Sequence, residues 1–125
     1  MRAREFMTSP VIAVTPDVPI HEAAALLSSH GFTALAVVDG QRLVGVVTDA
    51  DLLRGEHTDH RPGETPVRAV MSTPVLGVDP DAPIGAVARI MVEDHVRWVP
   101  VVAGAALVGV VTRRDLVRVM AHTGT

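Results

Sequence analysis

The sequence predicts an α/β protein made of two copies of a β-α-β-β-α unit, and three observations carry this prediction. Residues 7–54 align with residues 71–118 without a gap, at a constant offset of 64 positions. Each copy alternates short apolar segments typical of strands with stretches of helical spacing. The motif Gly-Val-Val-Thr-x-x-Asp begins at Gly45 and again at Gly109. Because each copy alone is small for a stable core, we expect a single module over residues 1–125.

The first half of each copy predicts a strand followed by a helix. Residues 2–7 are expected to form a short helical lead-in, and residues 11–14 a short buried strand. Pro19 suits the first turn of a helix, and Gly31 suits a helix end near His30. The apolar residues of this helix follow i, i+3, i+4, i+7 spacing: Ile20, Ala23, Ala24 and Leu27 in the first copy, and Ile84, Val87, Ala88 and Met91 in the second.

The second half of each copy predicts a β-hairpin followed by a helix. Residues 34–38 and 43–47 are expected to pair across Asp39-Gly40, a dipeptide suited to the positive φ angles of a tight turn. Residues 98–102 and 107–111 are the matching strands of the second copy. The last helix of each copy follows Thr48 or Thr112, and its apolar members are Ala50, Leu52 and Leu53 in the first copy and Leu116, Val117, Val119 and Met120 in the second.

A polar segment, residues 55–66, separates the copies and predicts a surface linker. Its His57, Asp59 and His60 are possible metal ligands, but a flexible loop does not preorganise a metal site. We therefore expect a solvated linker and no metal.

Composition excludes several classes of function. A net charge of −3 and an aromatic content of 2% argue against nucleic-acid binding, which needs a positive field and stacking platforms. The chain has no cysteine, which excludes disulfides and thiolate chemistry. Its apolar runs are far shorter than the roughly 18 residues of a membrane span, and no signal peptide is expected at the start. The default expectation is a soluble cytoplasmic protein.

The junction before the last helix of each copy permits two interpretations. In the first, Thr48 with Asp51, and Thr112 with Asp115, form capping boxes that satisfy the unpaired amides of the first helical turn. In the second, the same groups at a helix N-terminus bind a hydroxyl-rich, anionic ligand. The two interpretations are compatible.

Two units that begin Met-Thr/Ser-x-Pro-Val and end Gly-Val-Val-Thr-x-x-Asp-Leu resemble a tandem pair of CBS domains, the arrangement called a Bateman module. The resemblance implies a pseudo-twofold α/β module, in which two small three-stranded sheets pack together with helices outside. It implies a regulatory function, with AMP, ADP, ATP or S-adenosylmethionine bound in clefts between the repeats. Most such modules regulate an attached enzyme or transporter; here we expect a stand-alone module, with a separate regulated protein as a candidate partner. No cofactor is required beyond this ligand.

The resemblance also assigns ligand contacts. Asp51 and Asp115 match the carboxylate that holds the ribose hydroxyls, and Thr48 and Thr112 match a ribose or phosphate contact. The backbone that contacts the adenine edge matches two segments: Ser9, Pro10 and Val11 in the first copy, and Thr73, Pro74 and Val75 in the second.

The two copies differ around these positions. Pro100 keeps a proline that the family favours in the second strand, and Trp98 is expected either in the core or in the pocket wall. Arg97, Arg113 and Arg114 are candidate phosphate contacts, whereas the first copy has Thr33, Asp49 and Ala50 there. Arginine pairs with phosphate and aspartate repels it, so we expect the site at Asp115 to bind phosphate better. Two alternatives remain open: Arg113 and Arg114 form a solvated helix face, or an arginine of one copy contacts the ligand of the other copy.

We therefore expect a ligand-sensing module that is not an enzyme; the alternative is a protein-interaction subunit with vestigial clefts. The sequence has no nucleophile elbow, no Walker loop and no His-Glu-x-x-His helix. The resemblance implies a homodimer formed through helices, and the candidate apolar surfaces lie around Leu26, Leu52, Ile90, Leu116 and Met120.

Overall fold

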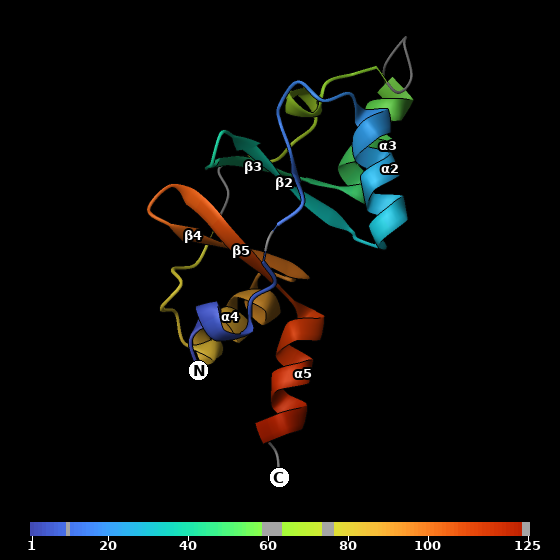
Figure 1. The fold of residues 1–125 in the computed structure, drawn as a ribbon. Helices are drawn as coiled ribbons and strands as arrows, with labels where there is room; N and C mark the ends of the chain where they lie inside the picture. Colours follow the sequence, from blue (N-terminus) through green and yellow to red (C-terminus); the bar gives the residue numbers. More distant parts are fainter. Residues whose placement is uncertain (10, 59–63, 74–76, 124–125) are drawn as a thin grey trace. The chain divides into compact units, whose positions relative to one another are not determined.

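The computed structural model describes residues 1–9, 11–58, 64–73 and 77–123, with the side chains of residues 56–58 and 123 left out. The chain divides into two compact units. We call Ile12–Val75 the first unit, and Met1–Val11 together with Leu76–Thr125 the second unit. The blue N-terminal helix in Figure 1 accordingly lies with the orange and red elements of the second unit.

The first unit contains the predicted strand, helix, hairpin and helix. Strand β1 (Ala13–Val14) runs parallel to β2 (Ala34–Asp39), and β2 pairs with β3 (Arg42–Thr48) in antiparallel orientation. Helix α2 (Ile20–His30) packs against α3 (Asp49–Thr58), as Figure 1 shows. The predicted element order is therefore confirmed for this copy.

The predicted hairpin is confirmed, but its turn lies one residue later. Asp39 still pairs with Arg42, which leaves Gly40 and Gln41 as the two-residue loop. Gly40 has φ 64°, a value that glycine adopts without steric cost.

The core of the first unit lies between its sheet and its helices. Its buried members include Ile20, Leu27, Leu35 and Val47. The prediction that Ala24 belongs to the same apolar stripe is wrong, because Ala24 is exposed. Ile20, Ala23 and Leu27 already fill the face of α2 that meets the core, and Ala24 lies at the edge of that face.

The second unit repeats this arrangement with α4 (Ile84–Glu93), β4 (Trp98–Ala103), β5 (Ala106–Thr112) and α5 (Arg113–Thr123). Strands β4 and β5 pair in antiparallel orientation. A single parallel bridge between Val78 and Val101 replaces the two-residue strand β1 of the first unit. The expected third strand is thus reduced to one bridge among the described residues.

The core of the second unit draws on a segment from the start of the chain. Its buried residues are Ala3, Phe6, Val78, Val87, Met91, Val99, Val101, Val111, Leu116 and Val119. Val117 and Met120, two of the apolar residues predicted for this helix, are 62% and 64% exposed. Leu116 and Val119 already cover the face of α5 that packs on this core, so the neighbouring positions face outward.

Each unit contains a short helical segment that lies, in the sequence, just before the other copy. The segment before the first copy packs in the second unit, and the segment before the second copy packs in the first unit. In the second unit, the predicted lead-in helix is α1 (Ala3–Phe6); the Ala3 amide donates to the Ala82 carbonyl at 2.8 Å, and Arg4 pairs with Asp81. In the first unit, the short 3₁₀ helix η1 (Val67–Ala69) makes the equivalent contacts, and Arg68 pairs with Asp17.

Helix α3 extends past the position at which the linker was expected to begin. It ends at Thr58, so residues 55–58 are helical. Gly55 is buried, and a Cβ added to it would lie 2.9 Å from Cγ1 of Val70. The absence of a side chain lets the helix pass close to the segment that follows η1.

His95 has a backbone conformation that glycine occupies in the other copy. It follows α4 with φ 54°, whereas Gly31 ends α2 with φ 66°. A residue with a side chain costs roughly 1–2 kcal/mol in this backbone conformation, and glycine avoids that cost. Glycine also loses more chain entropy on folding, which offsets part of the benefit, so His95→Gly is expected to raise the free energy of unfolding by about 0.5–1 kcal/mol. Urea denaturation measures the change, with Gly31→His expected to lower the stability. A loss of stability in His95→Gly would show that the imidazole makes a compensating contact.

Candidate functional site

The two Thr-x-x-Asp junctions are capping boxes. At the start of α5, the Thr112 amide donates to Oδ2 of Asp115 at 2.8 Å, and the Asp115 amide donates to Oγ1 of Thr112 at 3.3 Å. At the start of α3, the Thr48 amide donates to Oδ2 of Asp51 at 2.8 Å, and the Asp51 amide donates to Oγ1 of Thr48 at 3.2 Å. The capping interpretation of the motif is confirmed in both units.

Both capping carboxylates are almost fully buried and are held by an arginine one helical turn later. Asp51 is 3% exposed and Asp115 is 2% exposed. Arg118 donates from Nη2 to Oδ1 of Asp115 at 2.7 Å, and Arg54 makes the equivalent contact with Asp51. The sequence analysis missed these arginines, although their identity at the same offset as the rest of the duplication was a usable signal.

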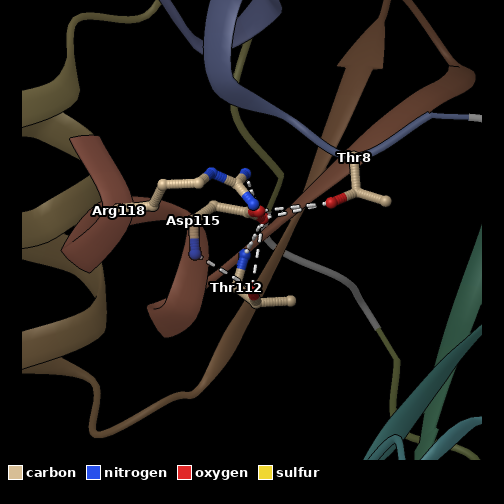
Figure 2. Close-up of polar contacts among 4 residues, drawn as sticks. All are labelled: Thr8, Thr112, Asp115 and Arg118. Carbon is tan, nitrogen blue, oxygen red and sulfur yellow. Dashed lines mark hydrogen bonds and ion pairs between the residues drawn. The ribbon is translucent and has the colours of Figure 1, made fainter. Parts of the chain in front are cut away.

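Asp115 has a further partner from the start of the chain, shown in Figure 2. The Thr8 hydroxyl lies 3.3 Å from both Oδ1 and Oδ2 of Asp115. The backbone of Thr8 is paired with Val110 of β5, through N–O distances of 2.7 and 3.1 Å. This contact was also missed, because nothing local in the sequence links Thr8 to a residue so distant along the chain.

The same backbone pairing occurs in the first unit without the side-chain contact. Ser72, the counterpart of Thr8, pairs with Val46 of β3 at 3.2 and 2.8 Å. Within the part of the chain that the structure describes, the Ser72 hydroxyl makes no hydrogen bond to Asp51. The two carboxylates therefore differ in their hydrogen-bond partners.

The glycines of the repeated motif leave room for a methionine side chain from the paired segment. A Cβ on Gly45 would lie 2.6 Å from Sδ of Met71, and a Cβ on Gly109 would clash with Met7. Each glycine thus allows close packing of the residue that precedes Ser72 or Thr8.

Backbone pairing brings several predicted residues of the second unit to the start of α5. The Arg113 amide donates to the Arg97 carbonyl at 3.2 Å, and Trp98 lies opposite Thr112 in the β4–β5 pair. The side chains of Arg97, Arg113 and Arg114 are exposed, Trp98 is half-buried, and Pro100 is buried. In the first unit, the Asp49 amide donates to the Thr33 carbonyl at 3.1 Å.

The segments predicted to contact adenine are only partly described. Ser9 and Thr73 are exposed, and Val11 is half-buried. Pro10, Pro74 and Val75 lie outside the described residues, as do Asp59, His60 and the side chain of His57. No group of three potential metal ligands occurs among the residues that the structure covers.

An apolar groove of about 830 Å³ lies on the first unit between α2 and α3. It is lined by Ile20, Leu27, Phe32 and Leu52, with Leu53 71% exposed at its edge. This groove differs chemically from the capping sites, because its lining is largely apolar. No described helix is long and apolar enough to cross a membrane.

The exposed apolar residues differ from the set predicted as dimer surfaces. Leu52 and Leu116 belong to the two cores, and Leu26 and Ile90 are half-buried against them, because these side chains lie on the inward faces of their helices. Met120 is exposed as predicted, and Leu53, Val92 and Val117 are exposed as well. The homodimer itself stays a prediction.

The family model described as "CBS domain" matches residues 3–57 and 67–122, so this chain belongs to the CBS domain family and contains a tandem CBS pair. The resemblance predicted from the duplicated motifs is confirmed. CBS domain-containing protein YhcV of Bacillus subtilis is 34% identical over 90% of this chain and 81% of its own length. An A-adding tRNA nucleotidyltransferase of Geobacter sulfurreducens is 39% identical over 98% of this chain, which spans only 14% of that enzyme.

Solved structures support the same fold. The putative acetoin utilization protein AcuB of Vibrio cholerae matches with a TM-score of 0.91 and 28% identity, over 98% of this chain and 91% of its own. CBSX2 in complex with AMP matches with a TM-score of 0.87 and 28% identity, over 99% and 98%. The CBS pair of protein MJ0100, in complex with 5′-methylthioadenosine and S-adenosyl-L-methionine, matches with a TM-score of 0.85 and 27% identity, over 98% and 97%.

Proposed function

We propose that this chain is a regulatory sensor module that binds an adenosine-containing ligand, such as AMP, ADP, ATP or S-adenosylmethionine, without catalysis. The observation that carries the proposal is the buried carboxylate fixed at the start of α3 and again at the start of α5. A preorganised carboxylate can accept hydrogen bonds from both hydroxyls of a ribose cis-diol. The similarity to CBS pairs that hold AMP, 5′-methylthioadenosine and S-adenosyl-L-methionine supports this ligand class.

The surroundings of the two carboxylates favour phosphate in the second unit. Arg97 and Arg113 are joined by a backbone hydrogen bond near the Asp115 cap, and their side chains are exposed. The first unit has Thr33 and the acidic Asp49 at these places. Because a guanidinium pairs with phosphate while a carboxylate repels it, the site around Asp115 binds a phosphate group better than the site around Asp51.

The test is a thermal-shift panel of AMP, ADP, ATP, S-adenosylmethionine and the matching guanine nucleotides. At a ligand concentration about 100 times Kd, a ligand that binds only the folded state adds roughly 2.7 kcal/mol of stability. We expect at least one adenosine compound to raise Tm, and we expect Asp51→Asn or Asp115→Asn to reduce that rise. Exposed Asp94→Asn is the matched control. No rise with any adenosine compound at millimolar concentration would contradict the proposal.

A protein-interaction subunit with vestigial ligand sites is the second candidate. It is favoured by the observation that both carboxylates are buried and already hydrogen-bonded as helix caps. In that case the Asp115 variant loses the same stability with and without nucleotide. The thermal-shift panel therefore distinguishes the two candidates.

A further inference from the structure

The two capping carboxylates differ in how many of their acceptor positions are already used. Asp115 accepts from the Thr112 amide, the Thr112 hydroxyl at 3.1 Å, the Thr8 hydroxyl and Arg118. An ionised carboxylate has about four lone-pair positions, so these donors account for its acceptor capacity. Figure 2 shows the donors converging on this one side chain.

Asp51 has acceptor positions to spare. The side-chain oxygens of Asp51 accept from the Thr48 amide and from Arg54, and no other donor reaches them among the residues that the structure describes. The counterpart of Thr8 in this unit is Ser72, whose hydroxyl makes no such bond although its backbone is held in the same way. In the described part of the chain, the two units thus differ in two hydroxyl contacts, those that Thr8 and Thr112 make with Asp115, and of these only the Thr8 contact comes from outside the repeated motif.

We propose that Thr8 is a positioning residue that occupies Asp115 in the absence of ligand and makes the two sites unequal toward a cis-diol. The inference rests on the proposed function and deepens it. A ribose bound at Asp51 gains hydrogen bonds to open acceptor positions. A ribose bound at Asp115 must replace the Thr8 hydroxyl, so part of its hydrogen bonding is an exchange and adds less affinity.

Packing and backbone hydrogen bonds hold the Thr8 segment next to the Asp115 carboxylate. Its backbone is paired with Val110 in both directions, and the preceding Met7 packs against Gly109. Phe6 is buried in the core of the second unit. The hydroxyl is therefore presented to Asp115 by a fixed segment, and only rotation of its side chain is needed to release it.

The test compares AMP with 2′,3′-dideoxy-AMP by calorimetry in an Asp51→Asn background, which isolates the second unit. We expect Thr8→Val to strengthen AMP binding about tenfold, by freeing acceptor positions on Asp115, and to leave dideoxy-AMP binding unchanged. Thr8→Ser, which keeps the hydroxyl, should behave like its parent. A structural role alone would change both ligands equally, and unchanged dideoxy-AMP binding also shows that the variant is folded.

The matched control is Ser72→Ala in an Asp115→Asn background, where AMP affinity should stay the same because Ser72 makes no bond to Asp51. Equal AMP affinity in Thr8→Val and its parent overturns the inference while the proposed function survives. No AMP binding to the unsubstituted chain overturns this inference, and the proposed function falls as well only if ADP, ATP and S-adenosylmethionine also fail to bind.

Discussion

Replacing Asp115 with alanine is expected to lower the free energy of unfolding by about 2–3 kcal/mol in the absence of any ligand. The substitution removes the acceptor for the Thr112 amide at the start of α5 and for the Thr8 hydroxyl. It also leaves Arg118 without its carboxylate partner. Since the carboxylate is 2% exposed, water cannot readily replace these bonds. Urea denaturation of the unliganded protein measures the loss.

Three comparisons make this result specific. Asp115→Asn keeps one acceptor oxygen and should cost less than Asp115→Ala. Asp51→Ala should also cost less, because Asp51 has no contact equivalent to that of Thr8 among the described residues. Asp94→Ala, at an exposed position after α4, should change stability by no more than about 0.5 kcal/mol. If Asp115→Ala were as mild as Asp94→Ala, the capping box would contribute little to the fold.

Replacing Phe6 with alanine is expected to cost about 3–5 kcal/mol, the range for removing a buried aromatic side chain. Phe6 is 4% exposed and belongs to the core of the second unit, together with Val87, Met91 and Leu116. It reaches that core from the start of the chain, in a segment joined to Ala82 and Val110 by backbone hydrogen bonds. Chemical denaturation gives the global loss, and amide hydrogen exchange should show reduced protection in α4, α5 and their strands.

The chain supplies its own control in Phe32, the other phenylalanine. Phe32 is 43% exposed and makes a T-shaped contact with His30, with ring centroids 5.3 Å apart. Phe32→Ala should therefore cost about 1 kcal/mol. Similar losses for the two variants would show that the N-terminal segment is not an integral part of the second unit.

The local elements were predictable because short-range rules dictate them. The helical spacing of Ile20, Ala23 and Leu27, the proline before α2 and the glycine after it define that helix within the sequence itself. The Thr48 and Asp51 capping box was predictable for the same reason, since all its atoms lie within one helical turn. The duplication then carried each assignment to the second copy.

Exposure was less predictable, because helical spacing locates a face but not its width. Ala24 follows the stripe of α2 and is nevertheless exposed, while Leu52 and Leu116 are buried in the cores. Only the packing of each helix on its own unit shows where the buried face ends.

The sequence by itself determined the duplication, the strands, the helices and the chemistry of the two caps. The tertiary structure alone decided that Phe6 and Thr8 belong with the second copy, and that the Thr8 hydroxyl joins the donors around Asp115. Thr8 and Asp115 are 107 positions apart, a separation over which neither periodicity nor turn chemistry specifies a partner. Long-range packing brings the Thr8 hydroxyl to Asp115 and, among the described residues, brings no equivalent donor to Asp51, although the motif around both is the same.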